Sequence, residues 1–236
     1  MLSGMPIEIV DPLRRHPRIS ALAVLVGLVL ASPGLAQSSR PQQESPDQPE
    51  ATAPPEAGKE SARRPLVEKI PDSAVERAKL LDNLYALLAT AEDEPAAEQT
   101  AEAIARLWRA SGSETVNLLM GRAAKSVNDK NNALALKLLD AVVELAPDYA
   151  EAWSQRAQVL YLEDETQRAV GDLRRALALD PNHFRALEAL AQILRESGEK
   201  KGALQAFKKL LEVHPFASGA KQVADELERE VGGQGI

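Results

Sequence analysis

Hydrophobic and polar positions along the second half of the chain follow a helical spacing, and the whole pattern recurs every 34 residues. With Val116, Ala150 and Phe184 as the first residues of successive units, equivalent places carry equivalent residue types. The eighth and twentieth places hold alanine, and the twenty-fourth and twenty-seventh hold mostly larger apolar residues. In that order of places, the residues are Ala123, Ala157 and Ala191 at the eighth; Ala135, Ala169 and Ala203 at the twentieth; Leu139, Leu173 and Phe207 at the twenty-fourth; and Val142, Ala176 and Leu210 at the twenty-seventh. This pattern predicts an array of helix-turn-helix units, in which the alanines let paired helices approach closely.

A proline closes each unit, because Pro147, Pro181 and Pro215 stand one period apart. Proline has no amide hydrogen to continue a helix, and it pushes the preceding residue out of the α region. We therefore expect the second helix of each unit to end just before its proline.

The segment from Ala152 to Pro181 resembles the tetratricopeptide repeat family. The phrases Trp153–Ala157 and Leu177–Leu187 look like those of exported alphaproteobacterial members, and the resemblance covers roughly residues 80–220. It implies an all-α fold, an α-solenoid of about four TPR helix-turn-helix repeats plus a C-terminal capping helix. It implies little about function, because one fold hosts many functions.

The period divides a TPR domain over 72–231 into four repeats and a cap. The first repeat is divergent, with Ser113 where the proline belongs and residues 72–81 as a longer lead-in. After the last repeat, apolar residues at helical spacing predict an amphipathic cap. The expected boundaries are repeats at 82–115, 116–149, 150–183 and 184–217, a cap at 218–231 and a flexible tail at 232–236.

The N-terminal residues 1–36 have the three parts of a secretory signal peptide. Arg14, Arg15 and Arg18 precede an apolar run to Ala31, and a small-x-small site ends at Ala36. Cleavage near Ala36 predicts a periplasmic or secreted protein without membrane insertion. An uncleaved inner-membrane anchor is the alternative, although the run is shorter than the roughly 20 residues of a spanning helix. The chain has no cysteine, which excludes a disulfide and a lipoprotein attachment site.

Residues 37–71 are expected to form a disordered, Pro-rich linker. No Val, Ile, Leu, Met or aromatic residue occurs from Gln37 to Pro65, so this stretch cannot bury enough apolar surface to offset the entropy of ordering. It is either a spacer that holds the repeats away from a surface or a segment without a function of its own that follows the signal peptide.

Charge and composition exclude one class of partner, the nucleic acids. The formal net charge is −7 and aromatic residues make up 3% of the chain. Nucleic-acid binding needs a basic stripe and aromatic stacking partners, so that class is excluded.

Catalytic and metal-binding patterns are not found. Beyond His16 in the leader, the chain has only His183 and His214, which lie at equivalent repeat junctions. No HExxH, phosphate loop, GxSxG or cysteine nucleophile is present. The acidic run 163–165 falls in a turn, where helix capping is the ordinary role. We expect no enzyme activity, no cofactor, no metal and no small-molecule substrate.

The family resemblance implies a partner-binding concave face, formed by the second, fifth, ninth and twelfth places of each first helix. Carried onto this chain, its main residues are Asn117, Met120, Glu151, Ser154, Gln158, Tyr161, Arg185, Glu188, Gln192 and Arg195. Such a mixed surface suits an extended peptide or a helix. The alternative is that this face is an ordinary hydrated surface that binds no partner. No basic residue occupies a fifth place, so the carboxylate clamp of chaperone-binding relatives is not indicated.

Arginine occupies the usually apolar seventh place in two repeats, at Arg122 and Arg156. We expect the guanidinium of Arg156 to pair with an acid such as Asp140 or Asp172 while its stem packs between helices. Together these patterns predict a non-enzymatic adaptor or scaffold for a protein partner in the bacterial periplasm. The alternative is a membrane-tethered structural spacer, and a mature N-terminus at Gln37 or Met1 would distinguish the two.

Overall fold

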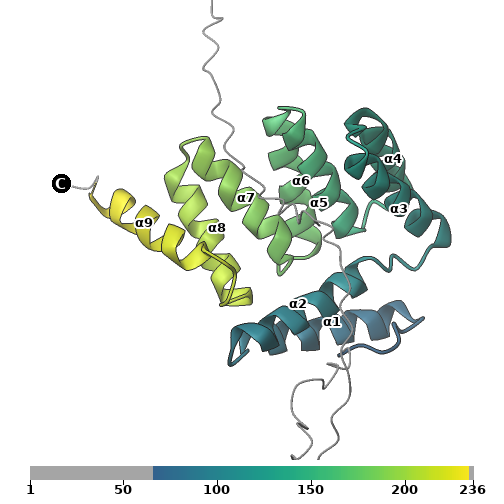
Figure 1. Ribbon diagram of the computed structural model, residues 1–236, viewed down its shortest axis with the longest axis horizontal. Helices are drawn as coiled ribbons and strands as arrows, with labels where there is room; N and C mark the ends of the chain where they lie inside the picture. The colour runs from purple at the N-terminus through teal and green to yellow at the C-terminus, as the bar shows by residue number, and fades with distance from the viewer. Residues whose placement is uncertain (1–65, 234–236) are drawn as a thin grey trace, which may run out of the picture. The chain divides into compact units, whose positions relative to one another are not determined.

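The computed structural model describes residues 66–233, all within the compact unit Glu56–Ile236. The expected signal peptide and its expected cleavage site, the expected linker as far as residue 65 and the last three residues lie outside this part. The described part is all-α, as expected (Figure 1). Its helices are α1 Ala74–Ala89, α2 Glu94–Trp108, α3 Glu114–Asn128, α4 Asn132–Leu145, α5 Ala150–Leu162, α6 Thr166–Leu179, α7 Phe184–Glu196, α8 Lys200–Val213 and α9 Ala220–Gly232.

Helices α3 to α8 form three antiparallel hairpins that stack side by side, with α9 packed on α8 (Figure 1). Helices α5 and α7 begin at Ala150 and Phe184, the first places of their units, and α3 begins two residues before Val116. The second helices α4, α6 and α8 end two residues before their prolines, which confirms the expected effect of proline. The periodic alanines at the eighth and twentieth places are buried in all three units.

Side-chain and backbone caps explain where several helices begin. Ser73, Asp93 and Ser113 each accept a hydrogen bond from a backbone N–H in the first turn of α1, α2 and α3. Ser113, which stands at the place of the missing proline, therefore starts the helix of the next unit instead. His183 caps α7 in the same way through its imidazole.

The α1–α2 hairpin packs differently from the other three. Helix α4 packs against α5 and α6 against α7, but α2 has no comparable contact with α3, and α1 instead packs against α8. In Figure 1 the hairpin runs across the ends of the repeats. Its buried residues share one hydrophobic core with α7, α8 and α9, while α3–α4 and α5–α6 have cores of their own. The 34-residue period did not predict this crossed position.

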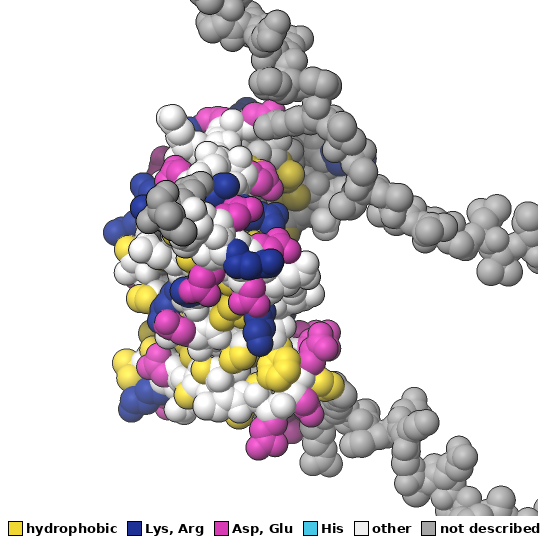
Figure 2. All heavy atoms as spheres, turned by 90° about the vertical axis from the view of Figure 1, so that its left-hand side faces the viewer, with side chains coloured by type: hydrophobic (Ala, Val, Ile, Leu, Met, Phe, Trp, Pro, Cys, Tyr) yellow, Lys and Arg dark blue, Asp and Glu magenta, His cyan; other side chains and the backbone are white. Residues whose placement is uncertain are grey.

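The surface around α9 mixes charges of both signs. Lys208 pairs with Glu228 at 2.7 Å, and Lys200 pairs with Glu230 at 3.1 Å, so ion pairs join α8 to α9. Figure 2, which faces this side, shows basic and acidic side chains interspersed with hydrophobic ones. This side presents no large field of a single sign.

Candidate functional site: a groove on the first helices and the hairpin beside it

A hollow of about 240 Å³ lies on the first helices of the three stacked units. Apolar side chains from α3, α4 and α5, among them Val127, Leu139 and Val159, form part of its lining. Amide and charged side chains complete it, including Gln155, Gln158 and Arg185. We call this hollow the groove. It combines an apolar surface with hydrogen-bonding groups, as recognition sites for peptides do.

The structure divides the ten expected partner-binding residues into three groups by exposure. Gln158, Arg185, Glu188 and Arg195 are exposed, and Asn117, Tyr161 and Gln192 are half-buried. Met120, Glu151 and Ser154 are buried, with only 4% of Glu151 and 1% of Ser154 exposed. These three cannot meet a partner in the conformation described. Partner binding by the face as a whole stays a prediction.

The α1–α2 hairpin lies against the end of this face where the first helices begin. The indole ring of Trp108, the last residue of α2, stacks on the imidazole of His183 with ring centroids 3.8 Å apart and planes within 1°. The same indole also packs against Phe184, at 4.7 Å between centroids. His183 and Phe184 start α7, so the hairpin covers the entry to the third stacked unit.

Glu151 and His183 form a buried pair close to this stack. The His183 Nε2 atom lies 3.0 Å from Oε2 of Glu151. The other ring nitrogen, Nδ1, accepts the backbone N–H of Ala186, so the hydrogen-bond partners assign the proton to Nε2, which donates to the carboxylate. The second oxygen of Glu151 accepts a hydrogen bond from Gln155. Both carboxylate oxygens of this buried acid are therefore satisfied.

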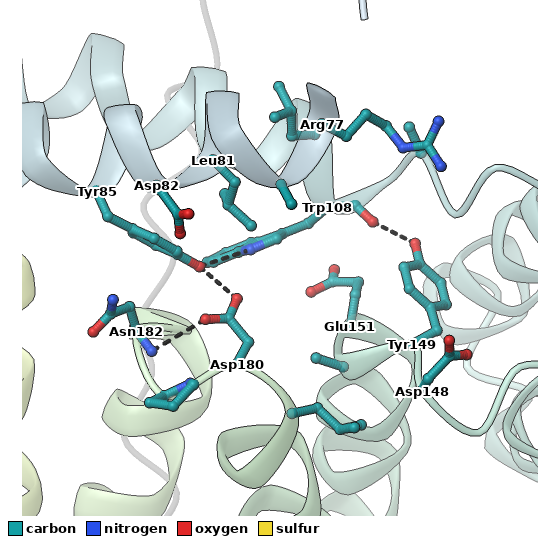
Figure 3. Close-up of a pocket in the computed structure, with 16 residues that line it drawn as sticks. Arg77, Leu81, Asp82, Tyr85, Trp108, Asp148, Tyr149, Glu151, Asp180 and Asn182 are labelled. Atoms are coloured by element: carbon teal, nitrogen blue, oxygen red, sulfur yellow. Dashed lines mark hydrogen bonds between the residues drawn. The ribbon is translucent and has the colours of Figure 1, made fainter. Parts of the chain in front are cut away.

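Tyr85 connects the hairpin to the loop before α7. Its hydroxyl donates to Oδ2 of Asp180 at 2.5 Å and accepts the indole N–H of Trp108 at 3.1 Å (Figure 3). Burial, together with the negative charge of Asp180, raises the pKa of Tyr85 far above its usual value. The phenol therefore stays protonated and remains a donor at any physiological pH.

Tyr149, just before α5, makes a second connection. Its hydroxyl donates to the backbone carbonyl of Trp108 (Figure 3). Burial raises the pKa of Tyr149, and the nearby charge of Glu151 adds to the effect. The end of α2 is thus held by two tyrosines, one from its own hairpin and one from the array.

A second cavity, of about 380 Å³, lies between the hairpin and the array. Carboxylates line it from both sides, with Asp82 on α1 and Asp148, Glu151 and Asp180 on the array (Figure 3). Arg77 also lines it, but its guanidinium donates to the backbone carbonyls of Pro71 and Asp72. Acidic groups thus face one another across the cavity between the hairpin and the repeats.

Comparison with known proteins identifies the family. The tetratricopeptide repeat model matches residues 160–224. A TPR repeat-containing protein of Rhizobium etli is 35% identical over 153 residues, which cover 65% of this chain and 75% of the relative. The chain belongs to the tetratricopeptide repeat family. A DnaJ protein of Oryza sativa subsp. japonica is 32% identical over 99 residues, which cover 42% of this TPR chain but only 20% of that relative.

Solved TPR structures resemble this chain more distantly. The crystal structure of MamA has a TM-score of 0.47 and 23% identity, and the match covers 57% of this chain and 78% of that one. The first TPR of Spaghetti, bound to an HSP90 peptide, has a TM-score of 0.48 and 15% identity, and the match covers 51% of this chain and 98% of that one.

Arg156 fills its expected role within the TPR array. Its Nε donates to Asp172 at 2.7 Å and its Nη1 to Asp140 at 3.0 Å, so one guanidinium holds both acids. The hydrogen bond to Asp172 is the main reason that the pKa of Arg156 is raised, and the charges of both acids add to it. The prediction of an arginine paired with Asp140 or Asp172 is confirmed for both partners.

Residues 66–233 contain no group of three or more His, Asp or Glu side chains that could hold a metal ion. Within the same range, no helix has the length and hydrophobicity to cross a bilayer.

Sequence reasoning missed the four residues that fasten the hairpin to the TPR array, namely Tyr85, Trp108, Tyr149 and Asp180. Trp108 carried a signal, because it is an indole at a twenty-seventh place where the other repeats have Val142, Ala176 and Leu210. An indole is too large for that place between two closely packed helices. It lies instead against the neighbouring loop at His183.

Proposed function

We propose that this TPR chain is a non-enzymatic adaptor of the bacterial periplasm, and that it holds a peptide or a helix of a protein partner in the groove. The observation that carries this proposal is the groove itself, which has an apolar surface with the Gln155, Gln158 and Arg185 side chains beside it. Amide side chains can bind the backbone of an extended segment, while the apolar part receives a side chain.

The size of the groove favours a side chain over a free small molecule. Its volume of about 240 Å³ is below the roughly 300–1,000 Å³ of typical small-molecule sites. Leu162, which lines it, is 60% exposed and gives an apolar contact at the open side. An apolar side chain of the partner would cover Leu162 and remove both surfaces from water.

Site-specific photo-crosslinking in the native envelope tests this proposal. A photoreactive residue at Gln158, which is exposed and lines the groove, should give a discrete adduct with one protein. The matched control is Arg174, an exposed residue on the second helix α6. Equal adducts at both positions, or none at either, would contradict a groove-bound partner. Sequencing the mature N-terminus tests the location, since Gln37 supports release into the periplasm and Met1 supports a membrane tether.

A further inference from the structure

We propose that the free edge of the array, formed by α3 and α4, docks an amphipathic helix of a partner protein that supplies a carboxylate. Helices α3 and α4 form the outermost hairpin of the stacked row (Figure 1). We call the outward side of this hairpin the array edge, and it comprises Leu118, Arg122 and Lys125 on α3 and Leu134, Leu138 and Leu145 on α4. The array edge is a different surface from the groove, so this inference does not rest on the proposed function.

The side of α3 that lies at the array edge is covered in the units that follow. The third and tenth places are Ala152 and Val159 in α5, and Ala186 and Ile193 in α7, and all four residues are buried. The preceding unit covers them, because α4 packs against α5 and α6 packs against α7. Leu118 stands at the third place of α3 and is 56% exposed. Among residues 66–233, no helix makes a comparable contact with this side of α3.

Helix α4 adds apolar side chains to the array edge. Leu134, Leu138 and Leu145 are spaced four and seven residues apart, which puts them on one side of the helix. The place of Leu138 is taken in α6 by Asp172, which binds Arg156 of the first helix, so this side borders the seventh place. Leu134 is 44% exposed and Leu145 is 62% exposed. Exposed apolar side chains that gather on one surface are typical of an interaction site.

The opposite end of the array is closed by a polar cap. Helix α9 packs on α8 with Ala224 and Leu227 buried, while charged residues such as Asp225 and Glu226 are exposed. The terminal units of a repeat array need such a polar outer face to stay soluble. Within residues 66–233 the array edge has no cap of this kind and exposes three leucines instead. The polar side of α9 in a second copy offers no apolar match for these leucines.

Arg122 indicates which charge the partner supplies. It stands at the seventh place, as Arg156 does in the next unit. Arg156 binds Asp140 of the preceding unit and Asp172 of its own unit. Arg122 is exposed, Leu138 takes the place of Asp172 beside it, and no acidic side chain of residues 66–233 forms an ion pair with it.

The divergent first repeat does not provide the missing acid. When the period is continued backwards, Arg106 falls at the place of Asp140, so two cations would meet if that repeat preceded α3 in register. The α1–α2 hairpin instead shares its core with α7, α8 and α9. Lys125, one turn after Arg122, already pairs with Asp129 of its own helix. The carboxylate for Arg122 therefore comes from another molecule.

The contact between α4 and α5 shows how the partner helix fits. Apolar side chains of α4 share a core with Ala152, and Asp140 of the same helix binds Arg156. A partner helix that docks in the same way would cover Leu118 with its apolar side and direct an Asp or Glu at Arg122. The charged hydrogen bond would fix the orientation of the helix, and the apolar contact would remove the leucines from water.

Photo-crosslinking of the full chain in the native envelope tests the array edge. A photoreactive residue at Thr115, which is exposed one turn before Leu118, should give an adduct with another protein. Mass spectrometry of the crosslinked peptide should find an Asp or Glu within it. Arg122→Glu should lower the adduct yield about tenfold or more, because two carboxylates would then meet, whereas Arg122→Lys should keep most of it. The matched control is Arg174→Glu, at an exposed arginine of α6, which should leave the yield unchanged.

A synthetic peptide of the crosslinked sequence extends the test to the purified chain. Its affinity, measured by fluorescence anisotropy, should fall about tenfold or more with Arg122→Glu and recover when the acid of the peptide is exchanged for Lys. Because Arg122 is exposed, Arg122→Glu should keep the melting temperature of the wild type, which separates lost binding from unfolding.

Three results would overturn the proposal. They are no adduct at Thr115, an adduct that Arg122→Glu leaves unchanged, and an adduct with a second copy of this chain. Each of them would leave the groove and its Gln158 adduct untouched. A missing Gln158 adduct beside an acid-dependent adduct at Thr115 would overturn the groove as the partner site and support the array edge.

Discussion

The indole of Trp108 lies flat on the imidazole of His183, with 3.8 Å between the ring centroids and 1° between the planes. The two residues are far apart in sequence, and their stack joins the end of the α1–α2 hairpin to the start of α7. Both rings are almost fully removed from water. The contact is therefore one of those that hold the hairpin against the start of α7.

Trp108→Ala should lower the free energy of unfolding by about 3–5 kcal/mol, the usual cost of removing a buried large aromatic side chain. The variant loses the stack on His183, the contact with Phe184 and the hydrogen bond to Tyr85. Urea unfolding followed by circular dichroism measures the change. Trp153→Ala is the control, because Trp153 is only half-buried and should cost less. A loss below about 1 kcal/mol for Trp108→Ala would show that the stack contributes little.

The 34-residue period predicted much of the array. Repetition of alanine and proline at constant places located the starts of α5 and α7 and the ends of α4, α6 and α8. These features follow from local rules, since proline ends a helix whatever surrounds it. The Arg156 pair was also predictable, because a guanidinium between helices needs an acid and the neighbouring helices α4 and α6 offered Asp140 and Asp172.

The position of the hairpin did not follow from the period, because periodicity gives the register of a unit but not the surface on which it packs. That choice depends on contacts between distant residues, such as Tyr85 with Asp180 and Trp108 with His183. Glu151, which the repeat register alone places on an open face, is buried and paired with His183. The candidate site was thus predicted as a surface, and the hairpin that packs beside it was not.

Arg156→Ala should destabilise the array by about 3 kcal/mol, because it leaves the buried carboxylate of Asp172 without its partner. The Asp172 side chain is only 10% exposed, so water cannot replace the guanidinium. The control is Lys125→Ala, which breaks an ion pair with Asp129 whose side chains are 75% and 56% exposed. That exposed pair should contribute at most about 1 kcal/mol. Equal melting temperatures for Arg156→Ala and the wild type would contradict the structural role of the arginine.

Alkaline pH should destabilise the protein through its buried tyrosines. The pKa values of Tyr85 and Tyr149 are raised in the folded state by burial, whereas an unfolded tyrosine titrates near pH 10. Above that pH the unfolded chain loses protons that the folded chain keeps. Stability that is fully present below about pH 10 is therefore lost as the pH rises, by up to about 1.4 kcal/mol per pH unit for each tyrosine.

The double variant Tyr85→Phe, Tyr149→Phe isolates this effect. Its urea midpoint should be lower than that of the wild type at pH 8, because three hydrogen bonds are missing, but it should fall less steeply between pH 9.5 and pH 11. Lysines titrate in the same range in both proteins, so the difference in slope reports the tyrosines. Parallel curves for the two proteins would mean that neither phenol is protected by burial.

Two glycines should respond in opposite ways to alanine. Gly112, in the connection between α2 and α3, has a φ of 87°, and a Cβ there would lie 2.6 Å from Nη2 of Arg77. The guanidinium can move aside, so the left-handed backbone accounts for most of the cost, and Gly112→Ala should destabilise by about 1–2 kcal/mol. Gly171 lies inside α6, and a Cβ there would meet nothing within 4 Å. Gly171→Ala should therefore stabilise by about 0.5–1 kcal/mol through helix propensity.

Thermal unfolding of the two single variants and of the wild type measures both changes in one series. The opposite signs matter, because they separate a glycine that directs the chain from one that merely weakens a helix. If Gly112→Ala were as stable as the wild type, the connection would not need its left-handed conformation. The crossed position of the hairpin would then rest on its buried core and on the contacts of Trp108 and Tyr85.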